Sequence, residues 1–185
     1  MSLALALSAG QTTELPPGGG ERWDVYAALP RDPRAILDVG CGEGGAFAPY
    51  RADGTYLAGI DFDPALLAVA GTRMDETQAL DLERDAFPAA WMGAFDVVAC
   101  CDVLEHLRDP WTVLARLRPL LAPDGVLVAS IPNIRQWRQL AKLVLGRWEY
   151  PEGMGTDQRD HVRFFTRRTI DLMFAEAGYA APRYY

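Results

Sequence analysis

Short apolar runs alternate along the chain with longer segments whose apolar residues recur at the spacing of a helix. The runs are nearly continuously apolar, which is typical of strands buried on both faces of a sheet. Strands that alternate with helices favour right-handed crossovers, so we expect an α/β fold with a Rossmann-like, doubly wound, mostly parallel sheet. In such sheets, ligands bind beyond the carboxyl ends of the strands. The predicted strands are residues 35–39, 56–60, 95–100 and 126–131, with a short extra one at 78–80.

The helices are predicted from apolar periodicity and from capping residues. Two Asp-Pro pairs place an aspartate N-cap before a proline at the first helical position. Thr166 can cap a last helix that stops at Gly178. Residues 134–145 are apolar on one helical face and basic or polar on the other. The Asp-Pro pairs are Asp63-Pro64, before a helix over 64–70, and Asp109-Pro110, before a helix over 111–121.

Length and composition indicate one globular domain. The chain has 185 residues, of which 50% are apolar and 23% charged, so it is too hydrophobic for a disordered chain. No apolar run is long enough to cross a membrane, and we expect no integral membrane association. Residues 11–20 are rich in glycine and proline. We therefore expect residues 1–20 to form a flexible leader and residues 21–185 to form a single domain.

The cysteines and the charge bear on compartment and partners. Cys41, Cys100 and Cys101 show neither a disulfide framework nor zinc-site spacing, which favours a reducing, cytoplasmic compartment. The formal net charge is −7. We expect no nucleic-acid partner, because general nucleic-acid binding depends on neutralising phosphates.

A glycine-rich segment follows the first predicted strand. Gly40, Gly42 and Gly45 have the G-x-G-x-x-G spacing of dinucleotide-binding loops, and Asp61 lies 21 residues after Gly40. Glycines allow a sharp turn and close approach of a ligand, and a carboxylate at Asp61 can accept hydrogen bonds from a ribose diol. The segment predicts an adenosine-containing cofactor, or else a glycine turn that only lets a helix pack on a strand.

Asp38 narrows the choice of cofactor. It lies two residues before Gly40, where a carboxylate would repel a pyrophosphate. A cofactor with a cationic part and no phosphate suits this position better. S-adenosylmethionine, which carries a sulfonium and an ammonium group, meets that description.

Four segments in order resemble the motifs of class I S-adenosylmethionine-dependent methyltransferases. The resemblance covers residues 21–180. It is greatest to the branch that holds ubiquinone-type O-methyltransferases and methyltransferases of glycan and secondary metabolism. The segments are residues 36–44 (ILDVGCGEG), 59–64 (GIDFDP), 95–106 (FDVVACCDVLEH) and 121–127 (LAPDGVL). Residues 130–133, 146–150 and 161–166 are shared with the glycan-associated members.

The resemblance also implies how the sheet ends. Family sheets usually have two further strands after the last helix, but only residues 179–185 follow Gly178. We expect the chain to supply the first of these strands and to lack the second. That difference would mean a truncated chain, a missing tail, or an open sheet edge that a partner covers.

The resemblance implies a role for each matching residue. Asp38 and the glycine-loop backbone would hold the methionine part of the cofactor, and Asp61 would bind the ribose. Phe62 would lie along the adenine or else belong to the core. Asp81 would take the adenine amino group, and the Cys100 carbonyl would face the ammonium. The implied cofactor-binding residues are Asp38, Gly40, Cys41, Gly42, Gly44, Asp61, Phe62, Asp81, Leu82 and Cys100.

His106 is the candidate catalytic base. Methyl transfer to a hydroxyl requires alignment of the acceptor with the methyl group and removal of a proton. His106 follows a predicted strand at the pocket end, and histidine is the side-chain type best suited to accept a proton near neutral pH. The alternative is that His106 caps or packs the next helix. Asp102, Glu105 and His106 could share a helical face and bind a divalent ion. The resemblance to ubiquinone-type members, in some of which such a set is associated with metal, would imply a glutamate in place of Asp102. Because aspartate is shorter than glutamate, we assign no metal site.

The predicted acceptor site lies in the C-terminal part of the chain. Residues 146–160 form a connection of the length found in lids and binding loops, whose aromatic residues would shield a substrate or anchor the loop. His161 would line the pocket or bond the backbone. The candidate substrate-binding residues are Asn133, Trp148, Tyr150, His161 and Arg163.

These features predict an S-adenosylmethionine-dependent methyltransferase of a small molecule, with S-adenosylhomocysteine as product. The acceptor oxygen would belong to a sugar or a quinone-like phenol. The alternatives are an NAD(P)-dependent oxidoreductase and a catalytically silent cofactor-binding module. DNA adenine methylation is disfavoured, because residues 131–133 lack a stacking motif of the Asn-Pro-Pro-Tyr type.

The charge is divided unevenly along the chain. Residues 1–134 hold 19 acidic and 9 basic side chains, whereas residues 135–185 hold 6 and 9. The acidic part contains the predicted site for a cationic cofactor, and the basic part favours an anionic acceptor. Arg135, Arg138 and Lys142 could alternatively meet an acidic membrane surface. We expect a monomer or a homodimer.

Overall fold

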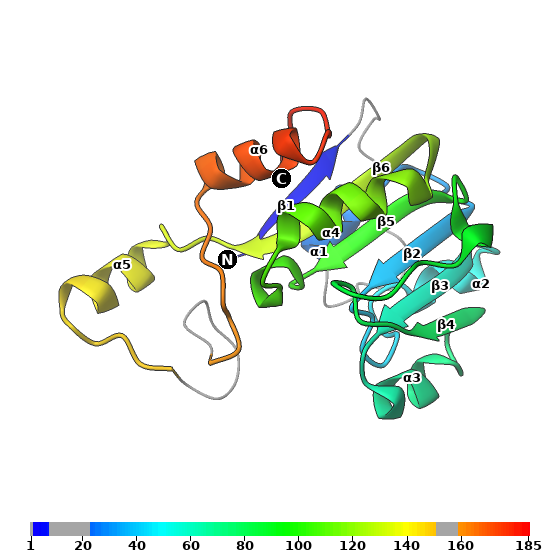
Figure 1. Ribbon diagram of the computed structural model, residues 1–185, viewed down its shortest axis with the longest axis horizontal. Coiled ribbons are helices and arrows are strands. Elements are labelled where there is room, and N and C mark those ends of the chain that lie inside the picture. Colours follow the sequence, from blue (N-terminus) through cyan, green and yellow to red (C-terminus); the bar gives the residue numbers. More distant parts are fainter. Residues whose placement is uncertain (1, 8–22, 151–158) are drawn as a thin grey trace.

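A twisted sheet forms the centre of the molecule (Figure 1). The computed structural model describes residues 2–7, 23–150 and 159–185. The seven strands follow the order β4-β3-β2-β5-β6-β1-β7. Those from β4 to β6 are parallel, β1 is antiparallel to β6, and β7 is antiparallel to β1. The bounds are β1 Ser2–Leu7, β2 Ala35–Val39, β3 Tyr56–Asp61, β4 Glu76–Ala79, β5 Phe95–Cys101, β6 Leu121–Pro132 and β7 Arg183–Tyr184.

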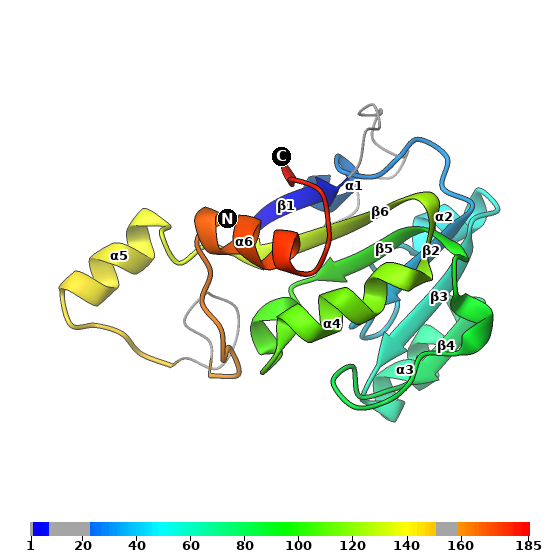
Figure 2. The same ribbon diagram turned by 45° about the horizontal axis from the view of Figure 1, so that its top comes forward.

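Helices cover both faces of the sheet (Figures 1 and 2). Neighbouring residues of a central strand, such as Ile36 and Leu37, point to opposite faces and enter two separate buried clusters. This explains why the strands are continuously apolar and confirms the predicted doubly wound fold. On one face lie α4 (Pro110–Leu117) and α6 (Arg167–Glu176), and on the other α1 (Trp23–Tyr26), α2 (Ala48–Ala52) and α3 (Pro64–Ala70). The short 3-10 turns are η1 (Ala89–Trp91), η2 (Leu104–His106) and η3 (Arg118–Leu120).

The predicted helix caps are present. The Asp63 carboxylate accepts a hydrogen bond from the Ala65 amide at 2.8 Å, and Asp109 accepts one from Thr112 at 3.1 Å. Thr166 forms a capping box with Thr169. The helix predicted over 111–121 is shorter than expected. It ends at Leu117 and continues as η3, because Pro119 cannot donate the backbone hydrogen bond that the helix needs.

In a dinucleotide-binding loop, the G-x-G-x-x-G segment leads directly into a helix. The glycine segment after β2 does not. Gly40, Gly42 and Gly44 have φ angles of 70°, 53° and 73°. This left-handed backbone is incompatible with a right-handed helix. The chain therefore turns as far as Phe47 before α2 begins.

The N-terminal segment corrects one prediction. Ser2–Leu7, which we expected to belong to a flexible leader, forms β1 and pairs with β6 over six residues in unbroken register. An unpaired edge of β6 would expose a row of backbone donors and acceptors, and β1 satisfies them. The strand after α6 pairs with β1 rather than with β6. Residues 8–20 of the predicted leader lie outside the described residues.

Helix α5 (Trp137–Val144) stands apart from both helical layers (Figures 1 and 2). It begins three residues later than the predicted start at Ile134. The Ile134 amide instead donates to the Phe165 carbonyl at 3.0 Å, and the Asn133 side chain accepts from the Arg135 amide at 2.9 Å. Within the described segments, no helix has the length and apolar character needed to span a membrane.

Candidate active site

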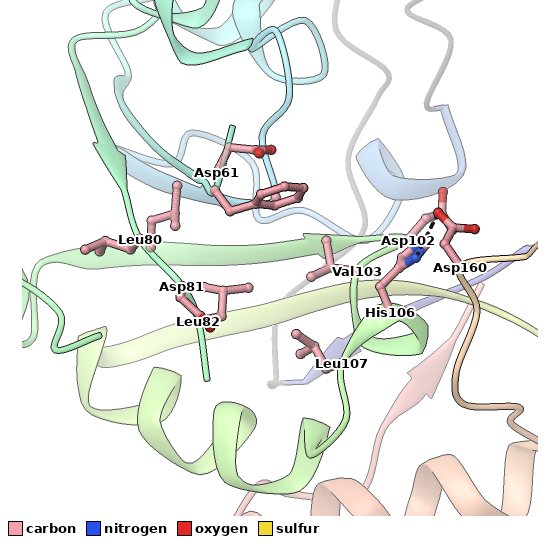
Figure 3. A pocket seen from close by; sticks show the side chains of 12 residues that line it. Asp61, Leu80, Asp81, Leu82, Asp102, Val103, His106, Leu107 and Asp160 are labelled. Atoms are coloured by element: carbon pink, nitrogen blue, oxygen red, sulfur yellow. Dashed lines mark ion pairs between the residues drawn. The ribbon is translucent and has the colours of Figure 1, made fainter. Parts of the chain in front are cut away.

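A cavity of about 610 Å³ lies beyond the carboxyl ends of β2, β3 and β5 (Figure 3). This is the edge at which the parallel sheet was expected to bind its ligand. Its walls come from the glycine segment, the end of β3, the loop after β4, and the turn η2. Predicted site residues on these walls are Gly40, Asp61, Phe62, Asp81, Leu82 and His106.

The glycine segment brings its backbone close to neighbouring side chains. A Cβ atom at Gly40 would lie 2.5 Å from Cγ2 of Val103, and one at Gly44 would lie 3.2 Å from the backbone of Ala70. At Gly42 a Cβ would meet nothing within 4 Å. Gly40 therefore allows close approach at the cavity wall, whereas Gly44 allows α3 to pack.

Asp61 is held in a fixed orientation at the end of β3. Its carboxylate accepts hydrogen bonds from the backbone amides of Gly42 at 2.9 Å and Asp63 at 3.0 Å. The residue is buried, yet it lines the cavity. A carboxylate has about four acceptor positions, so two remain for the hydroxyls of a ribose.

Phe62 and the loop after β4 complete this side of the cavity. Phe62 is 82% exposed, so the alternative that it belongs to the core is wrong. Asp81 accepts a hydrogen bond from the Glu83 amide at 2.9 Å, and Arg116 donates to the Leu82 carbonyl at 2.6 Å. These bonds order a loop that presents one carboxylate and apolar side chains to the cavity.

Other predicted cofactor residues lie behind the cavity wall. Asp38, Cys41 and Cys100 are buried in or directly after β2 and β5, and they are not among the described residues that line the cavity. Gly42 and Gly44 are also absent from the described residues that line the cavity. Burial, followed by the carboxylates of Asp38 and Asp61, raises the pKa of the Cys41 thiol to about 12. Burial also raises the pKa of Cys100. Both thiols stay protonated at neutral pH and are poor nucleophiles.

His106 faces the cavity from η2, opposite Asp61 (Figure 3). Its Nδ1 lies 3.3 Å from a carboxylate oxygen of Asp160, and its ring meets the ring of His161 edge-on at 4.7 Å between centroids. His161 is buried, whereas the Asp160 side chain is 69% exposed. His106 and His161, which we predicted for catalysis and for substrate binding, thus lie together.

Backbone hydrogen bonds bring these distant segments into contact. The amides of Val162 and Arg163 both donate to the Glu105 carbonyl, at 2.9 and 3.0 Å. The Arg163 guanidinium donates to the Arg108 carbonyl. The segment that follows Asp160 is therefore attached to η2, more than 50 residues earlier in the sequence.

The acidic residue before η2 has an unusual backbone. Asp102 has a φ of 55°, the only positive value among the non-glycine residues that the structure describes. Its carboxylate accepts a hydrogen bond from the Ser130 hydroxyl at 2.7 Å. This conformation ends β5 and starts the turn that carries His106.

The set of metal-ligating side chains differs from the one we considered. Among the described residues, Glu105, His106 and His161 offer ligand atoms within 4.8 Å of one another, and Asp102 is not a member. Asp102 precedes η2 in a left-handed backbone conformation, and its carboxylate instead accepts a hydrogen bond from the Ser130 hydroxyl. This group could hold a divalent ion through one oxygen and two nitrogens.

None of the predicted substrate residues, His161 included, is among the described residues that line the cavity. The Trp148 ring packs edge-on against Phe164 at 5.5 Å, and Tyr150 is 60% exposed. The Asn133 side chain closes the turn before α5. Arg163 lies 5.8 Å over the ring of Trp111. Residues 151–158 of the predicted lid lie outside the described residues, so the lid stays a prediction.

Sequence reasoning missed some residues of the cavity. Asp160, Val103 and Leu107 line it but were not predicted. Asp160 precedes His161 directly, and that proximity was the available signal. Its contact with His106 depends on a pairing between distant segments that no local pattern shows.

Comparisons with known proteins agree on one family. A family model described as a methyltransferase domain matches residues 21–181. The ubiquinone biosynthesis O-methyltransferase of Psychrobacter arcticus is 30% identical over 152 residues, which cover 79% of this chain and 59% of that protein. The enzyme of the same name from Thiobacillus denitrificans is 33% identical over 162 residues, covering 85% of this chain and 68% of that protein. The chain spans about three fifths of the length of the first of these relatives.

A solved structure agrees with the fold. A SAM-dependent methyltransferase from Archaeoglobus fulgidus superposes with a TM-score of 0.59 at 16% identity, over 78% of this chain and 60% of that one. At this identity the likeness shows the fold alone. The family model and both sequence relatives are methyltransferases. The oxidoreductase alternative is therefore not favoured.

Proposed function

The chain belongs to the class I S-adenosylmethionine-dependent methyltransferases, and from that premise we propose that it methylates an oxygen atom of a small, quinone-like phenol. The observation that carries this proposal is the position of His106. It lines the same cavity as Gly40 and Asp61, where a base can reach an acceptor placed beside the cofactor. The names of the two curated relatives support a phenolic acceptor.

The cofactor fits the residues around the glycine segment. S-adenosylmethionine supplies a methyl group that its sulfonium already activates. The Asp61 carboxylate, oriented by two backbone amides, would bind the ribose hydroxyls. Phe62 would cover the adenine, and Asp81 would accept from its amino group. Gly40 would let the backbone approach the methionine part, with the buried charge of Asp38 behind it.

His106 would remove the acceptor proton. Asp160 lies beside Nδ1, which favours the tautomer with a proton on that nitrogen. We therefore assign Nε2 to the acceptor proton. General-base catalysis of this kind contributes about 10²–10⁴-fold to rate. In this scheme Asp160 and His161 are positioning residues, because they contact the ring of His106.

The walls near His106 favour a phenol over a sugar. Val103 and Leu107, which flank His106 in and around η2, line the cavity with apolar surface. An aromatic ring gains from burial there, whereas sugar hydroxyls would lose hydrogen bonds to water. The basic C-terminal part supports an additional anionic group on the acceptor. The three free cysteines support a cytoplasmic location.

The test is methyl transfer from isotopically labelled S-adenosylmethionine to an ortho-diphenol. We expect the phenol to gain one labelled methyl group with equimolar S-adenosylhomocysteine, as measured by mass spectrometry. A matched sugar series should remain unmethylated. Labelled sugar with unlabelled phenol would contradict the proposed acceptor class, and cofactor binding without transfer to either series would favour a catalytically silent module.

A further inference from the structure

Helix α5 buries the polar Gln139 and leaves most of its apolar side chains exposed. Gln139 is 7% exposed, whereas Trp137 is 71%, Val144 84% and the following Leu145 65% exposed. Leu140 and Leu143 are also exposed. A surface helix of a soluble protein normally buries its apolar side. The predicted amphipathic pattern is therefore present, but in an inverted orientation.

Helix α5 lies on the side of the molecule where the parallel strands have their carboxyl ends, which is also the side of the cavity. It follows the carboxyl end of β6, where Asn133 pairs with Phe165 in an isolated parallel bridge. The cavity lies beyond the carboxyl ends of the neighbouring strands. Both views show α5 reaching outward from this side, away from α4 and α6 (Figures 1 and 2).

The segment that carries α5 is basic. Four basic residues and no acidic one occur between Ile134 and Trp148. The Arg138 guanidinium lies 5.4 Å over the ring of Trp137, at the border between the polar and apolar sides. The basic residues are Arg135, Arg138, Lys142 and Arg147. Tryptophan and leucine beside arginine and lysine are typical of helices that lie in a membrane interface.

We propose that α5 docks on an anionic membrane surface, with its apolar side in the interface and its basic residues at the lipid phosphates. An exposed apolar patch bordered by charge marks an interaction site. A second copy of the chain would present the same four cations across a two-fold interface, and like charges oppose that pairing. Anionic lipid complements these charges.

Docking would bring the cavity to the membrane. An acceptor dissolved in lipid could then reach His106 without crossing bulk water. Only this link rests on the proposed function, because the docking surface is defined by α5 itself.

The test is co-sedimentation of the full chain with vesicles of phosphatidylcholine and about one third phosphatidylserine. We expect binding that falls at least about tenfold in vesicles of phosphatidylcholine alone. Val144→Glu should lower the partition coefficient about tenfold or more, because it places a charge at the centre of the apolar side. Arg135→Glu with Arg138→Glu should lower it by about fivefold per charge removed.

Met92→Glu is the matched control. Met92 is 51% exposed and precedes β5, so it lies near the amino ends of the parallel strands, on the side away from α5. This variant should therefore bind vesicles as the wild type does. Absence of vesicle binding by the wild type would overturn the proposal. So would self-association that Val144→Glu abolishes while vesicles stay unbound, since a second copy would then be the occupant. An equal loss of vesicle binding in Met92→Glu and Val144→Glu would also contradict the proposal.

Turnover separates this proposal from the proposed function. The Val144→Glu variant should methylate a water-soluble phenol at the wild-type rate. Its rate toward a long-chain phenol held in vesicles should fall at least about tenfold. Vesicle binding by a wild type that methylates no phenol would support the docking surface and contradict the proposed function.

Discussion

The two sides of the cavity are built differently. The side proposed to bind the cofactor comes from three consecutive strands and their loops. Backbone amides of these same loops hold its carboxylates, as Gly42 and Asp63 hold Asp61 and Glu83 holds Asp81. The acceptor side joins η2 to a segment more than 50 residues later, through two backbone hydrogen bonds to the Glu105 carbonyl.

This difference separates two kinds of information in the chain. The cofactor side depends on local geometry, so its residues occur as recognisable motifs. The acceptor side depends on a long-range pairing between η2 and the segment that follows Asp160. We therefore expect substitutions on the cofactor side to change binding and stability, and substitutions on the acceptor side to change turnover.

The largest effect is expected at the centre of the acceptor side. His106→Ala should lower kcat by about 10²–10⁴-fold, because the acceptor proton loses its base. The affinity for S-adenosylhomocysteine, measured by calorimetry, should stay at the wild-type value. An equal loss of affinity and turnover would assign His106 a structural role and remove the contrast between the two sides.

The corresponding change on the cofactor side is Asp61→Ala. It removes the acceptor for the ribose and for two backbone amides, so S-adenosylhomocysteine should bind about 100-fold more weakly. Asp61→Asn retains one acceptor oxygen and should lose less affinity for S-adenosylhomocysteine than Asp61→Ala does. Wild-type affinity in Asp61→Ala would show that the ribose is not bound there.

The glycine segment offers a matched pair of substitutions. Gly42→Ala places a Cβ in open space and should cost about 1–2 kcal/mol for the left-handed backbone alone. Gly40→Ala has the same backbone cost and adds a collision with Val103, so its free energy of unfolding should fall by about 1–3 kcal/mol more. Denaturant titration measures both. Val103→Ala in the Gly40→Ala background should restore part of the loss, and equal stability of the two single variants would refute the close approach.

A smaller effect is expected where Asp160 contacts His106. The Asp160 side chain is 69% exposed, and exposed ion pairs contribute only about 0.2–1 kcal/mol. Asp160→Asn should therefore lower kcat by no more than about fivefold, as measured by initial rates. A loss as large as that of His106→Ala would make Asp160 part of the proton transfer itself.

The smallest effect is expected at the Cys41 thiol, behind the cofactor side. Because burial and two carboxylates raise its pKa to about 12, the reactive thiolate forms only at strongly alkaline pH, and about one molecule in 10⁴ carries it at pH 8. Iodoacetamide at pH 8 should leave Cys41 unmodified in the folded protein and modify it after unfolding, as read by peptide mass mapping. Rapid labelling of the folded chain would show that the glycine segment opens.

The contrast between local geometry and long-range pairing also explains what could be predicted from the sequence. The apolar runs predicted β2, β3, β5 and β6, and the Asp-Pro pairs predicted the starts of α3 and α4. The contact between Asp160 and His106 could not be predicted, because it depends on pairing between distant segments. The orientation of α5 could not be predicted either, since periodicity shows that a helix has two faces but not which one is buried.

The strand β1 was missed for a different reason. Leucine and alanine alternate over residues 3–7, which is the period of a strand, but the run is short and a glycine-rich stretch follows it. Only the unpaired edge of β6 shows where such a strand belongs.

The central claim is that the glycine segment and Asp61 form a site for S-adenosylmethionine and not for a dinucleotide. Calorimetric titration of the wild-type chain with S-adenosylmethionine and, separately, with NADH tests it most directly. We predict saturable binding of one S-adenosylmethionine per chain, weakened about 100-fold in Asp61→Ala, and no heat of binding with NADH. Saturable binding of NADH, with none of S-adenosylmethionine, would contradict it.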